Sequence, residues 1–177
     1  AFDQSSDVAL NSGSLLNLNG NNQLANRLSG SGGEVQLSSG ATLTANNQVA
    51  ADNSLFAGTI TGTGALTKIG GGELTLTGDA THTGLTTVSA GALTIGNGTT
   101  SGSISSDILN NAVLNFNRGD NTAYAGVLSG TGTLNKLGAG VLTLTGLNSV
   151  QGSVDVQAGT LKLNQQGGAF RTTGNYT

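Results

Sequence analysis

The only histidine of the chain, His82, limits the catalytic chemistry that the sequence can support. A Ser-His-Asp triad would have to use this residue, because its histidine takes the proton of the serine hydroxyl. A zinc site would also rest on it alone, since the chain has no cysteine and no second histidine. We therefore expect no catalytic residue and no metal site in this chain.

Glycine pairs that precede a lysine raise the question of a phosphate-binding loop. Gly62 and Gly64 precede Lys68, and the same pattern returns before Lys136. A dinucleotide-binding loop needs a third glycine, a P-loop needs Ser or Thr directly after its lysine, and both need a following helix. The two segments lack these features, so we expect the glycines to form corners and we expect no cofactor. The spacing predicts that the two lysines stack on one face as a solvated stripe.

The nine acidic residues are spread widely along the chain. A calcium-binding nonapeptide repeat would place Asp at a fixed short distance after paired glycines, and Gly71-Gly72 is followed by Glu73 instead. A polysaccharide lyase would need carboxylates clustered with Arg or Lys. With so few charges we expect a protein that is not an enzyme, with such a lyase as a further alternative.

The tripeptide Arg118-Gly119-Asp120 matches an integrin-type recognition sequence. It lies between Asn117 and Asn121, which predicts a loop. Exposed loops on a rigid scaffold often carry binding functions, so Arg118, Gly119 and Asp120 are candidate receptor-binding residues. The alternative is that a single residue completes the tripeptide by chance, and both interpretations stay open.

Composition excludes several classes of partner. The net charge is -3, the sequence pI is about 4.7, and the six basic residues are scattered, which argues against nucleic-acid binding. No apolar run approaches the roughly 20 residues that span a bilayer, so we expect no direct membrane insertion. The chain starts at Ala1 without a signal peptide, and we expect it to be a piece of a longer secreted protein.

The elements that must position these residues are short β-strands. Apolar residues alternate with Thr, Asn and Asp, as at Leu74 and Leu76 and again at Leu142 and Leu144, and no helical periodicity appears. Each apolar stretch ends in a cluster of Gly, Asn or Ser, the residues that favour tight corners. The pattern predicts an all-β fold, either a sandwich or a solenoid.

A repeat decides between these two folds. Residues 57–96 and 125–164 match each other without a gap at an offset of 68, and about half of the positions are identical. A fixed internal period indicates stacked, similar units, so we predict one β-solenoid over residues 1–177. Dividing this offset into three coils predicts roughly 22–23 residues per coil.

The two copies resemble the autotransporter-associated β-strand repeat, also called the passenger-associated transport repeat. Their shared positions are small residues at corners and aliphatic residues in strands. The positions that we assign a structural role in the repeat are Gly62, Gly64, Leu74, Leu76, Gly78, Gly130, Gly132, Leu142, Leu144 and Gly146. His82 and Val150 occupy a slot where the family usually has Tyr.

The resemblance implies a right-handed parallel β-helix from the passenger of a Gram-negative autotransporter. It implies a secreted or surface-exposed protein whose partners are neighbouring β-helix coils and an outer-membrane β-barrel of the parent protein. The expected function is a stalk that supports folding and translocation across the outer membrane. The alternative is an adhesin module that binds a host receptor, carbohydrate or itself.

Overall fold

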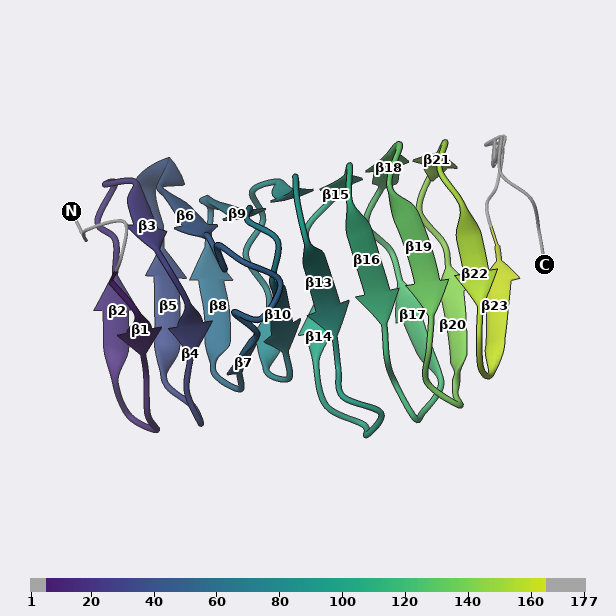
Figure 1. Cartoon of the computed structure of the whole chain (residues 1–177), viewed down its shortest axis with the longest axis horizontal. Coiled ribbons are helices and arrows are strands. Elements are labelled where there is room, and N and C mark those ends of the chain that lie inside the picture. Colours follow the sequence, from purple (N-terminus) through teal and green to yellow (C-terminus); the bar gives the residue numbers. More distant parts are fainter. Residues whose placement is uncertain (1–5, 165–177) are drawn as a thin grey trace.

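The chain winds into a parallel β-solenoid of about eight turns, which confirms the predicted all-β fold (Figure 1). The structure, a computed structural model, describes residues 6–164, so residues 1–5 and 165–177 of the predicted solenoid lie outside the described range. Within that range 23 strands follow one another at three per turn, and one 3₁₀ turn, η1 (Ser38–Gly40), is the helical element.

Every third strand lies on the same face of the solenoid, and all pairs of neighbours are parallel. Face one contains β1 (Val8–Ala9), β4 (Leu28–Ser29), β7 (Ser54–Phe56), β10 (Glu73–Leu76), β13 (Ala92–Ile95), β16 (Val113–Phe116), β19 (Thr133–Lys136) and β22 (Val154–Val156). Face two contains β2 (Leu15–Asn17), β5 (Glu34–Leu37), β8 (Thr59–Gly62), β11 (Asp79–Ala80), β14 (Ser103–Ile104), β17 (Thr122–Tyr124), β20 (Val141–Leu144) and β23 (Thr160–Leu163). Face three contains β3 (Gln23–Ala25), β6 (Thr42–Ala45), β9 (Ala65–Lys68), β12 (Thr86–Val88), β15 (Ile108–Asn110), β18 (Leu128–Gly130) and β21 (Ser149–Val150).

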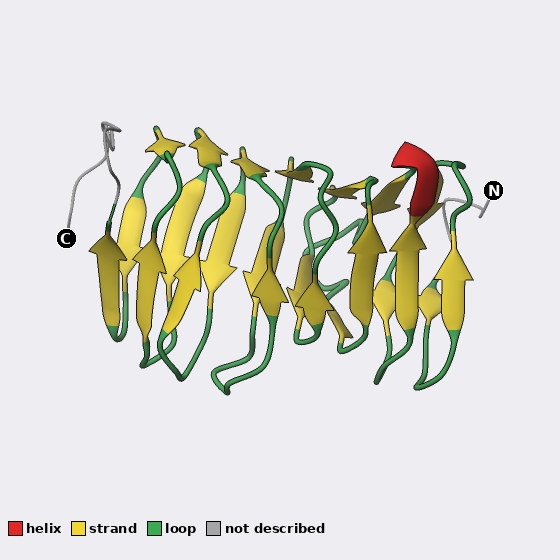
Figure 2. Cartoon of the chain, turned by 180° about the vertical axis from the view of Figure 1, so that it is seen from behind, coloured by secondary structure: helices red, strands yellow, loops and turns green. Residues whose placement is uncertain are grey.

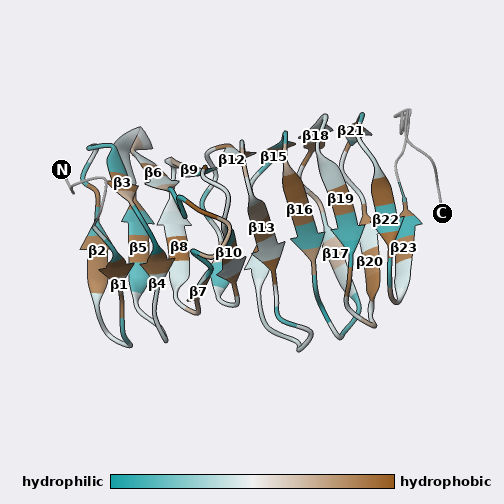
Figure 3. Ribbon diagram, in the orientation of Figure 1, coloured by the Kyte–Doolittle hydropathy of each residue, from teal (hydrophilic) through white to brown (hydrophobic). Residues whose placement is uncertain are grey.

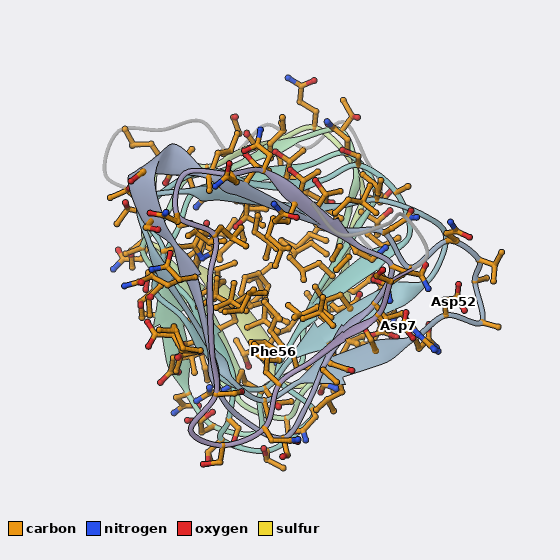
Figure 4. The ribbon with its side chains drawn as sticks, turned by 90° about the vertical axis from the view of Figure 1, so that its left-hand side faces the viewer. Asp7, Asp52 and Phe56 are labelled. Atoms are coloured by element: carbon orange, nitrogen blue, oxygen red, sulfur yellow. The ribbon has the colours of Figure 1, made fainter. Side chains whose placement is uncertain are left out.

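The core is a column of inward side chains enclosed by the three faces. Figure 4, which looks along the solenoid, shows a roughly triangular outline with side chains filling the centre; Phe56 lies on the inside, and Asp7 and Asp52 lie outside near one corner. Along a strand the buried and more exposed positions alternate, as in β10 and β20, so apolar and polar bands alternate along the strands in Figure 3. Burying each Leu contributes roughly 1.5–3 kcal/mol.

The register shows that the coils are shorter than the sequence predicts. Leu114 pairs with Leu134 in the next coil, and the corresponding pairs are Leu74–Leu93 in a shorter coil and Val35–Ile60 in a longer one. The repeat offset of 68 takes β9 to β19, which is ten strands, and three strands make one turn. The offset therefore covers three and one third turns, each of about 20 residues. The prediction of three coils of roughly 22–23 residues per repeat is wrong.

Because ten strands are not a whole number of turns, the two copies start on different faces. In the first copy Leu66 lies in β9 on face three, whereas the equivalent Leu134 lies in β19 on face one. The predicted alternation places the strand side chains correctly all the same: Leu74 of the first copy and Leu142 and Leu144 of the second are buried. The alternation of apolar and polar residues works in both copies, although they start on different faces, because all three faces direct apolar side chains inward.

The glycine corners allow the coils to approach closely. Gly62 and Gly130 hold equivalent places in the two copies, and both have positive φ, +98° and +108°, a conformation that L side chains rarely adopt. At the other glycines with a predicted structural role the coils themselves leave no room. A Cβ at any of them would lie between 1.9 and 2.4 Å from a backbone atom of the preceding coil, as at Gly64, Gly78, Gly132 and Gly146.

Candidate functional site

Face two is interrupted between β14 and β17, although these strands follow each other in the stack. They belong to separate sheets, of five and three strands, and across the described residues no backbone hydrogen bond joins residues 102–105 to residues 122–125. Figure 2 shows this interval as visibly wider than the others on the same face. At the break, two neighbouring coils each present one unpaired strand edge, that of β14 and that of β17.

The chain makes an excursion directly before β14. Ile60 pairs with Ala80, and Ala80 pairs in turn with Ile104, so the coil that leads into β14 is longer than the coil before it. The additional length forms the loop between Gly96 and Gly102, whose ends meet: a Cβ on Gly102 would lie 2.6 Å from the backbone nitrogen of Gly96. β14 keeps its pairing with β11 in the preceding coil, whereas it does not pair with β17 in the next coil.

A pocket of about 280 Å³ opens at this break. Its floor is apolar, and its rim carries hydroxyl, amide and charged groups. The apolar side chains of the lining are Ile95, Ile104, Phe116, Tyr124 and Leu142, and the rim residues are Ser103, Arg118, Asp120, Asn121 and Thr122. The rings of Phe116 and Tyr124 lie 5.7 Å apart at an interplanar angle of 51°. This combination of an apolar floor and a few polar groups is typical of small-molecule sites.

Arg118 and Asp120, the candidate receptor-binding residues, form part of this rim. Arg118 Nε and Nη2 donate to the two oxygens of Asp120 at 2.8 and 2.9 Å, and Arg118 Nη1 donates to the carbonyl oxygen of Gly102 in the preceding coil. The hydrogen bonds from Arg118 hold the pKa of Asp120 below its usual value. The Arg118 side chain is only 13% exposed, so the guanidinium braces the two coils where backbone pairing stops.

Hydrogen bonds close the break at both ends. At one end the Gly119 N–H donates to the carbonyl oxygen of Thr99 at 2.7 Å. At the other end the Tyr124 hydroxyl donates to the carbonyl oxygen of Ser106 at 2.7 Å. Burial, and to a lesser degree the charge of Asp107, raises the pKa of Tyr124, so this hydroxyl stays protonated. The unpaired interval is thus bounded at both ends by hydrogen bonds, so it forms a window in the face and not a continuous groove.

His82 lies in the corner between faces two and three, away from the rim of this pocket. Its Nε2 is 2.9 Å from Thr86 Oγ1, which in turn is 2.7 Å from Ser106 Oγ, and all three residues are buried. Its Nδ1 is buried without a hydrogen-bond partner, and burial lowers the pKa of the imidazole to about 4. Residues 6–164 contain no group of three His, Asp or Glu side chains arranged to hold a metal ion.

Lys68 and Lys136 are buried, which contradicts the predicted solvated stripe. Lys68 Nζ donates to the carbonyl oxygens of Ile69 at 2.5 Å and Gly70 at 3.1 Å, and Lys136 Nζ donates to that of Gly138. Burial lowers the pKa of both ammonium groups, to about 8 for Lys68. The two lysines also lie on different faces, because the repeat offset is not a whole number of coils.

The pocket itself was not predicted from the sequence. The tripeptide 118–120 correctly marked a loop, but its partner Gly102 comes much earlier in the chain and no local pattern links the two. The loop at 96–102 is longer than the tight corners, but the loop at 46–53 is longer still, so loop length alone does not mark the break. Among the described residues, no helix is long and apolar enough to cross a membrane.

Comparisons with known proteins agree with this architecture. The passenger-associated-transport-repeat family matches residues 66–95 and 134–163, which run from β9 to β13 and from β19 to β23. The "Adhesin BmaC autotransporter" of Brucella suis biovar 1 (strain 1330) is 45% identical over 96 residues, which cover 54% of this chain and 3% of that protein. No solved structure matches. The chain thus carries two copies of the passenger-associated transport repeat, the repeat of surface-exposed or secreted autotransporter passengers.

Proposed function

We propose that this segment acts as a β-helical stalk that supports folding and outer-membrane translocation of an autotransporter passenger. The observation that carries the proposal is the stacking itself, in which coils pair along most of their strands and cover the apolar side chains of the coil before. Its partners would be the neighbouring coils and an outer-membrane β-barrel of the parent protein.

The last described coil illustrates why folding can advance coil by coil. Leu161 and Leu163 of β23 pair in register with the buried Leu142 and Leu144. Leu163 is nevertheless 45% exposed, since no described coil covers it. A further coil would bury such side chains and gain roughly 2 kcal/mol, taking about 0.1 kcal/mol per residue over about 20 residues. That is several times the thermal energy, which is enough to favour outward movement of a threading chain.

A deletion in the parent protein tests the stalk role. Removing residues 125–164 should reduce surface exposure and protease resistance of the passenger upstream. The matched control replaces residues 125–164 by residues 57–96, which keeps the length and the stacking pattern and should restore both. Unchanged secretion and protease resistance after the deletion would refute the proposed role.

An adhesive function is a second candidate because the named relative is an adhesin. A receptor that recognises Arg118 and Asp120 would meet them as an ion pair, since both carboxylate oxygens accept from the guanidinium. Attachment of cells to the wild-type chain and to Arg118→Ala and Asp120→Ala tests this role, and equal attachment refutes it. Self-association would appear as concentration-dependent sedimentation.

We infer a role that is not enzymatic, in line with the adhesin relative. The exposed charges of the described solenoid are few and include paired ones, as in Asp7–Arg27 and Asp120–Arg118. Incubation with acidic polysaccharides, followed by the absorbance of unsaturated products, tests the lyase alternative. Accumulation of such products would overturn the inference.

A further inference from the structure

We propose that the pocket between β14 and β17 binds a single neutral sugar ring, a site that goes beyond the stalk role and does not depend on it. The pocket is the one place on face two where two strand edges meet without pairing in the described solenoid. Its shape, its lining and its charge each restrict the class of ligand.

The shape favours a compact ligand over an extended one. The volume of about 280 Å³ lies at the low end of the range for small-molecule sites. The Gly119–Thr99 and Tyr124–Ser106 hydrogen bonds close the window at both ends, so a peptide strand cannot run through it without breaking them. A single six-membered ring satisfies both limits.

The walls offer main-chain donors and acceptors. In a parallel strand, alternate residues direct their N–H and C=O to opposite neighbours. Ser103 N and Ser105 N donate to the preceding coil, so the backbone groups of Ile104 point across the break. Thr145 N donates to Tyr124 O, so Ala123 points across the break from the other side. Sugar hydroxyls both donate and accept, and can therefore satisfy both edges.

The floor and the rim match the two surfaces of a sugar. Phe116, Tyr124 and Leu142 provide an apolar floor for the C–H face of the ring. Asp120, Asn121 and Thr122 follow one another at the rim and offer carboxylate, amide and hydroxyl groups to the ring hydroxyls. Asp120 can accept further hydrogen bonds beside those from Arg118, and Asn121, whose Oδ1 accepts from Val141 N, can donate from its amide nitrogen.

The charge of the site favours a neutral ligand over an acidic one. Each of the three nitrogens of Arg118 already donates a hydrogen bond, two to Asp120 and one to Gly102. Asp120 already neutralises the guanidinium, so a carboxylate on the ligand would meet the negative charge of Asp120 without a free positive charge to offset it. The Arg118–Asp120 pair is therefore expected to discriminate against uronic and sialic acids.

Amide NMR on the ¹⁵N-labelled chain tests the proposal. The probes are the methyl glycosides of glucose, galactose and mannose, and N-acetylglucosamine, against glucuronic acid and N-acetylneuraminic acid. We expect at least one neutral sugar, and neither acid, to shift the Ile104 and Ala123 amides in a saturable way at millimolar concentration. Absence of shifts there, shifts confined to another surface, or preference for the acids would overturn the proposal.

Two variants show whether sugar binding depends on this pocket. Thr122 pairs in register with the buried Leu142, so Thr122→Leu should fill the pocket and weaken sugar binding at least tenfold while the thermal midpoint is kept or raised. Thr143→Leu, on the same face outside the pocket, is the matched control and should bind as the wild type does. Equal binding by both variants would overturn the site.

A third variant, Asp120→Asn, tests the preference for neutral over acidic sugars, which Thr122→Leu does not test. It releases the charge of Arg118, so binding of glucuronic acid should rise relative to that of neutral sugars. An unchanged preference would overturn the assigned role of the Arg118–Asp120 pair. Binding of extended peptides in the absence of any sugar binding would also overturn the proposal. None of these measurements involves secretion, so a negative result would overturn the sugar site without affecting the proposed stalk role.

Discussion

Acidification is expected to destabilise the solenoid through one residue, His82. Its imidazole is fully buried, and burial lowers its pKa from 6.5 to about 4. The unfolded chain takes up a proton near pH 6.5, whereas the folded chain keeps the ring neutral down to about pH 4. Between these values the unfolded state binds more protons, so the free energy of unfolding decreases as the pH falls.

The size of the effect follows from the two pKa values. One unit of difference corresponds to about 1.4 kcal/mol, so the full shift corresponds to about 3 kcal/mol. Relative to pH 7.5, the loss should be roughly 1 kcal/mol at pH 5.5 and roughly 2–3 kcal/mol at pH 4.5. Below about pH 4 the folded histidine is protonated too, and its contribution becomes constant.

Urea unfolding at these three pH values measures the loss, and His82→Gln is the control. Glutamine stays neutral and its amide can still donate to Thr86 Oγ1. On acidification the variant should therefore lack the loss of stability that is assigned to His82. Asp7 and Asp120 do not interfere, because their arginine partners lower their pKa values and their contribution is lost only below about pH 4.

A single histidine also makes the titration directly visible, since its ring C–H signals stand alone in the NMR spectrum. We expect them to stay at their neutral positions until about pH 4 in the folded chain. Titration near pH 6.5 in the folded protein, or equal acid sensitivity of the wild type and His82→Gln, would refute the reasoning.

Two further substitutions test the corners of the solenoid. Lys68→Met removes the donor to three corner carbonyl oxygens and should lower the free energy of unfolding by about 2 kcal/mol, whereas the exposed Lys162→Met should change it by less than about 0.5 kcal/mol. Gly64→Ala should destabilise by more than about 2 kcal/mol because the new Cβ would lie 1.9 Å from the Ala41 oxygen, while Gly71→Ala makes only ordinary contacts and should be close to neutral. Urea unfolding measures both pairs, and equal effects within a pair would contradict the assigned contacts.

Much of the fold could be predicted because it depends on short-range pattern. The alternation at Leu74 and Leu76 directs both side chains into the core, and the glycines at 62 and 130 supply corners that most residues cannot form. A residue's inward or outward direction is decided by its immediate neighbours. One sequence without its structure is sufficient for that level of prediction.

The coil length could not be predicted, because the repeat offset gives only the product of the number of coils and the residues per coil. An offset of 68 is compatible with three long coils or with three and one third short ones. The choice depends on which strands pair, and the pairing of Leu114 with Leu134 selects the shorter coil. The pocket could not be predicted for a related reason: it lies where β14 and β17 do not pair, and no local pattern marks which neighbouring strands stay unpaired.

The lysines show why a repeat that is not a whole number of coils can still work. Lys68 Nζ reaches the carbonyl oxygens of Gly70 and Ala90, and Lys136 Nζ reaches those of Gly138 and Ala158. The partners hold equivalent places in the two copies, although one copy starts on face three and the other on face one. Each lysine therefore donates to the corner that follows it and to the corner one coil later, whichever face its strand lies on. Because the three faces of the solenoid are similar, a repeat unit can start on any of them, provided that the lysine finds the carbonyl oxygens of its two corners.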